Sequence, residues 1–140
     1  MSRAGKCHCG QVQWTVELPD ESVSMMLCHC GACKAMSSSG YSQNQMVPKS
    51  AFRYTKGEEL ISSYTYTSDN GGLPVHCYFC SICSCHPYHQ LEVLGPDTIV
   101  VKTVHVDGGL AFVPAVEIFG VCRQPWQKEI GLTFDNMPPA

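Results

Sequence analysis

Seven of the ten cysteines lie in three short clusters whose spacing suits metal ligation. The clusters are a C-x-C pair at Cys7 and Cys9, a C-x-C-x-x-C set at Cys28, Cys30 and Cys33, and a C-x-x-C pair at Cys80 and Cys83. Cysteines this close rarely pair with each other in a structural disulfide, whereas their thiolates can turn toward one ion. We therefore expect metal ligation rather than a disulfide framework.

The first and third clusters together supply four thiolates, those of Cys7, Cys9, Cys80 and Cys83. Four thiolates in a tetrahedron close a zinc ion off from water and substrate, so this set predicts a structural zinc. Such a site would connect the N-terminus to the middle of the chain. Closing that long loop would stabilise the fold, because the unfolded chain binds the ion less well.

The second cluster offers only three thiolates, those of Cys28, Cys30 and Cys33. Three protein ligands and one exchangeable position are the pattern of a catalytic zinc. Three thiolates leave a Zn²⁺ ion with a net negative charge, which weakens it as a Lewis acid but suits a soft fourth ligand such as a substrate thiolate. The sequence thus predicts Zn²⁺ in both sets and a small-molecule thiol or carbonyl substrate.

Two other interpretations of the second cluster stay open at this level. A fourth protein ligand would make it another closed structural site, and the candidates are Cys77, Cys85, Cys122, His29, His76 and His86. An iron–sulfur cluster is the other interpretation, but the last spacing in the run from Cys77 to Pro87 departs from the ferredoxin pattern.

Composition and length predict one domain with a small-molecule function. The 140 residues match the size of one domain, so we expect residues 1–140 to fold as a unit. A net charge of −3 without a basic block argues against nucleic-acid binding, and no apolar stretch is long enough to span a membrane. The segment Met1–Cys7 lacks the apolar core of a signal peptide, which favours the cytoplasm. These features do not define the oligomeric state.

Short alternating or β-branched runs between Gly and Pro turns predict a mostly β fold. We expect strands at residues 11–18, 52–55, 60–67, 74–79, 91–94, 98–106 and 116–119, and a short apolar run at residues 23–27 leads into the second cysteine cluster. A short helix can begin at Cys33 and would end in the Ser37–Gly40 segment, and residues 125–130 predict a loop or helical turn. Trp14 is expected in the core, and Trp126 in the core or beside a pocket.

The motifs occur in a specific order along the chain. They are Gly5-x-Cys7-x-Cys9-Gly10-x-Val12, Cys28-His29-Cys30-x-x-Cys33, Phe79-Cys80-x-x-Cys83, Val116-Glu117-Ile118-Phe119 and Arg123-Gln124-Pro125-Trp126. This ordered set, over about residues 5–127, resembles the glutathione-dependent formaldehyde-activating (GFA) family, also called the centromere-protein-V-like family. A single C-x-C pair is a weak signal, whereas the ordered set is specific.

The resemblance implies an Mss4-like fold, a complex of small antiparallel β-sheets built around a structural zinc on Cys7, Cys9, Cys80 and Cys83. It implies a catalytic zinc on Cys28, Cys30 and Cys33. The implied activity is that of a carbon–sulfur lyase, with glutathione as co-substrate and S-hydroxymethylglutathione as the adduct with formaldehyde. The alternatives are a zinc enzyme of the same fold for another small carbonyl compound, and a zinc-stabilised binding module without catalysis.

The chain departs from the family pattern beside the cysteine sets. Ser84 and Cys85 follow the C-x-x-C pair where the family usually has Gly, and Cys77 stands where a basic residue is common. These changes border the predicted active site, so they bear on which substrate is expected more than on which fold is expected.

Candidate partners of the substrate can also be named. Lys34 and Arg123 could bind a substrate carboxylate, although a solvated surface charge is the simpler interpretation of each. His29 is expected to point away from the metal. The candidate general acids or bases are His86, His105, Asp107 and Glu117.

Overall fold

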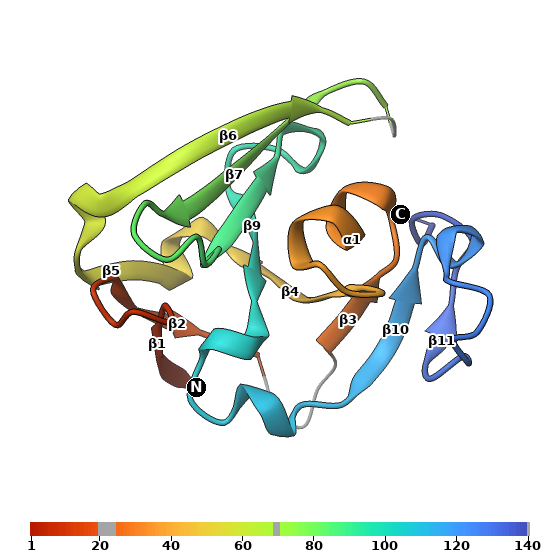
Figure 1. Cartoon of the computed structure of the whole chain (residues 1–140), viewed down its shortest axis with the longest axis horizontal. Coiled ribbons are helices and arrows are strands. Elements are labelled where there is room, and N and C mark those ends of the chain that lie inside the picture. Colours follow the sequence, from red (N-terminus) through yellow and green to blue (C-terminus); the bar gives the residue numbers. More distant parts are fainter. Residues whose placement is uncertain (20–24, 69–70, 140) are drawn as a thin grey trace.

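The computed structural model describes residues 1–19, 25–68 and 71–139, and most of its regular secondary structure is β-strand (Figure 1). One sheet has three strands in the order β1-β2-β5, formed by β1 (Ser2–Lys6), β2 (Gln13–Glu17) and β5 (Phe52–Lys56). All of its pairs are antiparallel. The predicted mostly β fold is confirmed.

The second sheet has eight strands in the order β11-β10-β3-β4-β9-β8-β7-β6. Its strands are β3 (Met25–Cys28), β4 (Ser42–Pro48), β6 (Ile61–Thr67), β7 (Pro74–Cys80), β8 (Tyr88–Leu91), β9 (Thr98–Lys102), β10 (Pro114–Ile118) and β11 (Leu132–Thr133). Strand β10 is parallel to β3 and β11, and the other pairs are antiparallel. This sheet is therefore mixed, and larger than the small antiparallel sheets expected.

Within the described residues, the helical elements are all short. The α-helix α1 spans Gly31–Ser37, and its C-cap Ser38 has a φ of 51°, so the helix ends in the serine-rich segment as predicted. The 3-10 helices are η1 (Lys49–Ala51), η2 (Glu58–Leu60), η3 (Glu92–Leu94), η4 (Thr103–His105), η5 (Gly109–Ala111) and η6 (Gly120–Cys122).

The strand predicted at residues 91–94 is wrong. Leu91 is the last residue of β8, and Glu92–Leu94 form η3. Val93 is 50% exposed, so its apolar character does not reflect burial in a sheet. The strand predicted at residues 98–106 is likewise shorter, because η4 follows β9 from Thr103.

Strand β4 lies at the centre of the large sheet, between β3 and β9, although its sequence did not predict a strand. Ser42, Asn44 and Gln45 are polar and yet buried there. Asn44 Nδ2 donates to Ser42 Oγ at 2.9 Å, and Asn44 Oδ1 accepts from Lys102 Nζ at 2.9 Å. These contacts satisfy the side chains of Ser42 and Asn44, two of the polar groups that hid the strand from a hydrophobic pattern.

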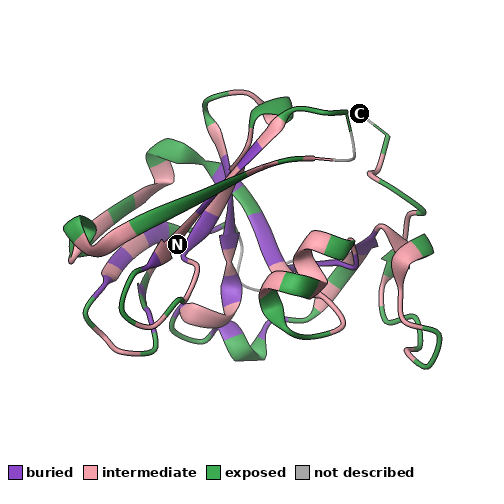
Figure 2. Ribbon diagram, turned by 45° about the horizontal axis from the view of Figure 1, so that its top comes forward, coloured by how far each residue is buried: buried purple, intermediate pink, exposed green. Residues whose placement is uncertain are grey.

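The hydrophobic core contains side chains from both sheets, and the buried positions gather along the middle of the strands (Figure 2). Trp14 of β2 is 1% exposed, which confirms its predicted place in the core. Gly5 of β1 pairs with Trp14, and a Cβ at Gly5 would lie only 2.3 Å from Trp14 Nε1. The indole thus lies across the backbone just before Cys7, which requires glycine there.

Candidate metal centres and the cavity between them

The sulfur atoms of Cys7, Cys9, Cys80 and Cys83 all lie within 4.8 Å of one another. Cys9 Sγ lies 3.4 Å from Cys7 Sγ and 3.8 Å from Cys80 Sγ. Zn–S bonds of about 2.3 Å in a tetrahedron separate the sulfurs by about 3.8 Å, so these four residues fit a zinc ion. We call them the four-cysteine centre.

The first half of the four-cysteine centre is the turn between β1 and β2. The Gly10 amide donates to the Cys7 carbonyl at 3.0 Å, and Gly10 has a φ of 77°. The Val12 amide donates to Cys7 Sγ at 3.4 Å. An amide directed at sulfur stabilises the thiolate that a metal requires.

The second half is the turn that follows β7. The Ser84 amide donates to the Cys80 carbonyl at 2.8 Å, and the Ile82 amide donates to Cys80 Sγ at 3.4 Å. Ser84 has a φ of 70°, in the left-handed region that favours glycine. The turn therefore keeps the geometry that suits the family's usual Gly, with a serine in its place.

The second set, Cys28, Cys30 and Cys33, also has its sulfur atoms within 4.8 Å of one another. Cys28 ends β3, Cys30 is the N-cap of α1 and Cys33 lies in the first turn of α1. Cys30 Sγ accepts a hydrogen bond from the Cys33 amide at 3.3 Å. The strand-to-helix junction thus gathers the three sulfurs, and this three-cysteine centre can hold a metal ion with thiolate ligands.

Among the described residues, no fourth histidine, cysteine or acidic ligand atom joins the three-cysteine centre. His76 is hydrogen-bonded instead to Thr65 and Glu92, each at 2.8 Å. Cys77 is in neither group of clustered sulfurs, and burial raises the pKa of its thiol to about 11.

His29 lies between two of the metal-site cysteines and is fully buried. Its Nε2 lies 2.8 Å from Glu117 Oε1, and its Nδ1 lies 3.2 Å from the Gly40 carbonyl oxygen. The carboxylate and the carbonyl are both hydrogen-bond acceptors. Whichever ring nitrogen of His29 carries the hydrogen therefore has an acceptor to bind. The side chain therefore fixes the Cys28–Cys33 segment against β10 and is not a ligand.

Glu117 is also fully buried, and its carboxylate is occupied by structural partners. Oε2 accepts hydrogen bonds from the Ile130 and Gly131 amides at 2.6 and 2.7 Å, and Arg123 lies 3.3 Å from Oε1. Burial alone would raise the pKa of Glu117, but the two amides, His29 and Arg123 hold that pKa down at about 2. Glu117 is thus a permanent carboxylate, which excludes it as a general acid.

Two of the four candidate acid–base residues line a cavity, and two do not. The cavity has a volume of about 380 Å³, and Cys33 of the three-cysteine centre and Cys83 of the four-cysteine centre both contribute to its wall. His86 and His105 line it, whereas Asp107 and Glu117 do not. Asp107 is an exposed residue.

Burial keeps the imidazoles of the cavity uncharged at neutral pH. Burial lowers the pKa of His105 to about 4, with help from the charges of His86 and Lys102. Burial and Lys102 lower the pKa of His86 as well, and His89 has a pKa well below its usual value for the same reasons. A neutral imidazole can accept a proton from a bound substrate.

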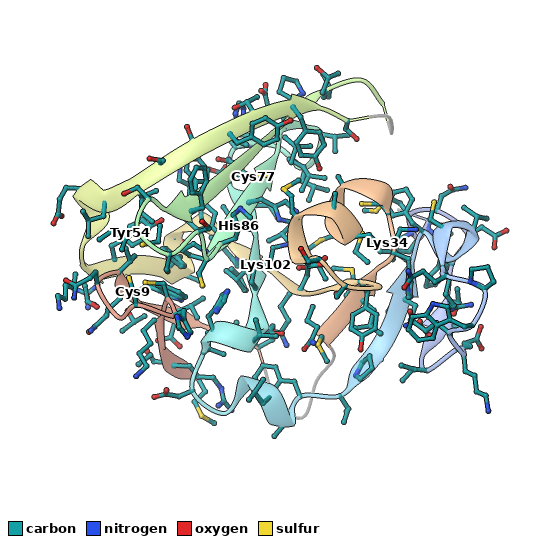
Figure 3. All side chains as sticks on the ribbon, in the orientation of Figure 1. Cys9, Lys34, Tyr54, Cys77, His86 and Lys102 are labelled. Atoms are coloured by element: carbon teal, nitrogen blue, oxygen red, sulfur yellow. The ribbon has the colours of Figure 1, made fainter. Side chains whose placement is uncertain are left out.

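The cavity contains two residues that the sequence did not single out, His89 and Lys102. Figure 3 shows Cys77, His86 and Lys102 gathered beside β9, between β7 and α1. Lys102 ends the apolar run Ile99–Val101, and a lysine at the end of such a buried strand is the signal that could have identified it.

Comparison with known proteins agrees with this geometry. The family model of the glutathione-dependent formaldehyde-activating enzyme matches residues 2–122. The chain belongs to this family. All seven cysteines of the two centres lie within the matched part of this GFA-family chain.

The fold of this GFA-family chain also occurs in a crystal structure of a Rhodobacter sphaeroides protein. The two share 24% sequence identity with a TM-score of 0.61, and the similarity covers 75% of this chain and 88% of the other. A search of curated proteins finds no match. None of the described helices reaches the length and apolarity that a membrane crossing requires.

Three further predictions can be compared with the structure. Lys34 Nζ donates a hydrogen bond to the Cys122 carbonyl oxygen at 2.5 Å, so its ammonium already has a partner in the protein backbone. The interpretation of Arg123 as a surface charge is wrong, because it is 17% exposed and pairs with Glu117. Trp126 is 74% exposed, so it does not pack in the core. Neither cation lines the cavity of about 380 Å³.

Proposed function

We propose that the chain is a zinc-dependent carbon–sulfur lyase of the GFA type, acting on adducts of a thiol with an aldehyde. S-hydroxymethylglutathione is the type of adduct that the family resemblance implies. The observation that carries this proposal is the three-cysteine centre at the wall of the cavity, with no fourth ligand atom among the described residues.

Cys28, Cys30 and Cys33 would hold the catalytic zinc, and Cys7, Cys9, Cys80 and Cys83 would hold a structural zinc. A bound zinc at the three-cysteine centre supplies a position for the substrate sulfur or oxygen and lowers the pKa of a thiol. The four-cysteine centre offers no such position, because its four thiolates complete a tetrahedron.

The cavity residues would manage the proton of the adduct. Breaking the C–S bond of a hydroxymethyl thioether forms a carbonyl from the hydroxyl, and the electron pair leaves on sulfur. The hydroxyl proton must therefore be removed, and it can return to the sulfur to give the free thiol. A neutral ring nitrogen of His86 can accept and return it, whereas His105, whose pKa burial lowers to about 4, is a weak base at neutral pH.

We also propose that residues 1–140 form a single domain that works in the cytoplasm. In support, one core cluster takes residues from both sheets, and all ten cysteines are free thiols. A reducing compartment keeps such thiols available as metal ligands.

Metal content and activity of Cys30→Ser test the catalytic role of the three-cysteine centre. We expect two zinc ions per wild-type chain and one in the variant. We also expect at least a 100-fold slower interconversion of S-hydroxymethylglutathione with glutathione and formaldehyde, measured by exchange NMR. Cys122→Ser, outside both centres, is the matched control. Wild-type activity in Cys30→Ser would overturn the proposal.

A further inference from the structure

The cavity between the two centres has one lysine and no carboxylate. Its lining includes Cys33, His86, His89, Lys102 and His105 and contains no aspartate or glutamate. Burial keeps the three imidazoles neutral at pH 7. Lys102 is therefore the one cation in the lining, which contains no carboxylate. Burial lowers the pKa of Lys102, an effect that the neighbouring thiolates of Cys33 and Cys28 partly offset.

Lys102 is held in place by a neutral partner. Its Nζ donates to Asn44 Oδ1 at 2.9 Å, and Asn44 is 2% exposed and fixed by Ser42 at 2.9 Å. An ammonium has three N–H donors, so this contact leaves donors for a ligand. In the described part of the chain, no carboxylate forms an ion pair with Lys102. A partly buried ammonium without an acidic partner is a site suited to an anion.

We propose that Lys102 binds a carboxylate of the substrate, and that the substrate is a small thiol or carbonyl compound carrying one carboxylate. This inference rests on the proposed function, since it places the reacting sulfur or carbonyl at the three-cysteine centre. Cys33 and Lys102 line the same cavity, so one small molecule can reach both. Lys102 is then a specificity-determining residue.

Among the thiols that the proposed function covers, a small monoanion would leave fewer charges unpaired in this cavity than glutathione would. Glutathione carries two carboxylates and one ammonium. The cavity lining provides one lysine for a carboxylate and no acidic side chain for an ammonium. One carboxylate on a small molecule matches one ammonium without leaving a charge unpaired.

The test compares two thiols that differ in one charged group, mercaptoacetate and 2-mercaptoethanol. Titration calorimetry of the zinc-loaded protein should give at least a tenfold lower Kd for mercaptoacetate, because its carboxylate adds a charge-assisted hydrogen bond to Lys102. Lys102→Met should make the two Kd values equal, and Lys102→Arg should keep the preference. Lys128→Met, at an exposed lysine, is the control. Zinc content and circular dichroism verify that each variant is folded.

Acetate separates this inference from the proposed function. If mercaptoacetate binds no tighter than acetate, and Lys102→Met weakens both, Lys102 is an anion site while the open position at the three-cysteine centre is refuted. If both thiols bind equally and tighter than acetate, the role of Lys102 is overturned and the open position stands. The role of Lys102 is also overturned if the preference for mercaptoacetate survives in Lys102→Met, or if mercaptoacetate does not bind at all.

Discussion

At the scale of single residues, Glu117 connects the three-cysteine centre to the C-terminal segment. Its carboxylate contacts the side chain of His29, which stands between two cysteines of the centre in the sequence. It also contacts Arg123 and the backbone amides of Ile130 and Gly131. Cys28 and Cys30 flank His29 in the chain, so any displacement of this imidazole would move the backbone of two metal-site cysteines. Glu117 is thus a positioning residue for the centre.

Glu117→Gln should destabilise the protein, because it leaves Arg123 without its counter-ion and places an amide N–H₂ against amide donors. We expect a loss of about 3 kcal/mol in the free energy of unfolding, measured with urea. The variant should also bind zinc more weakly at the three-cysteine centre. Glu129→Gln, at an exposed carboxylate, is the control. Equal stability of the two variants would contradict the role of Glu117.

The contribution of Glu117 should depend on pH. Its pKa is about 2 in the folded protein against an ordinary value of 4.5, so ionised Glu117 favours the folded state. The stability it adds is fully present above pH 4.5 and declines as the pH falls toward 2. The stability difference between wild type and Glu117→Gln should therefore shrink over this range. A difference that stays constant from pH 7 to about 3 would refute the assignment.

At the scale of elements, the turn between β5 and β6 supports both halves of the four-cysteine centre. Gly57 in this turn has a φ of 76°, and a Cβ on it would lie 2.1 Å from the Gln11 carbonyl oxygen. The Leu60 carbonyl in the same turn accepts from the Ser81 amide at 2.9 Å. Gln11 follows Cys9, and Ser81 follows Cys80, so the turn contacts the backbone beside both cysteine pairs.

Gly57→Ala should cost about 3 kcal/mol of folding stability, from the left-handed backbone and from the clash with Gln11. Gly72 has a φ of 70° with open space around its Cβ position, so Gly72→Ala should cost only about 1 kcal/mol. Thermal unfolding of both variants measures the difference. Similar costs for the two would mean that the contact with Gln11 does not restrict the turn.

At the scale of the whole molecule, the four-cysteine centre joins the two sheets. Cys7 and Cys9 belong to the turn between β1 and β2 of the small sheet, and Cys80 ends β7 of the large one. A metal ion there would cross-link residues more than 70 positions apart, as the separation of 71 between Cys9 and Cys80 shows. Such a cross-link restricts the unfolded chain more than a local one.

Cys80→Ser should destabilise the whole protein, whereas Cys30→Ser should leave most of the stability intact. A structural zinc contributes on the order of 10 kcal/mol in small metal-dependent folds, so we expect Cys80→Ser to lose several kcal/mol together with one zinc. Zinc analysis and urea unfolding of both variants measure this. Comparable stability losses would mean that the two centres do not divide into a structural and an exchangeable site.

The two cysteine sets, the mostly β fold and the burial of Trp14 could be predicted from the sequence alone. Ligand spacing and strand alternation are local properties, and Cys28, Cys30 and Cys33 lie within one short segment. Each half of the four-cysteine set is local as well, but the meeting of the two halves across 71 positions depends on the fold. Strand β4 could not be predicted, because the burial of Ser42, Asn44 and Gln45 depends on partners from other elements.

The surroundings of the cysteines depend on the tertiary structure. The fold pairs His29 with Glu117 across 88 positions of sequence and places Lys102 with Cys33 in one cavity. It also separates Asp107 and Glu117 from that cavity, although both were candidates on the same grounds as His86. The reason is physical: a thiol carries its affinity for metal wherever it lies, whereas the role of a carboxylate, imidazole or ammonium depends on burial and on neighbouring charges.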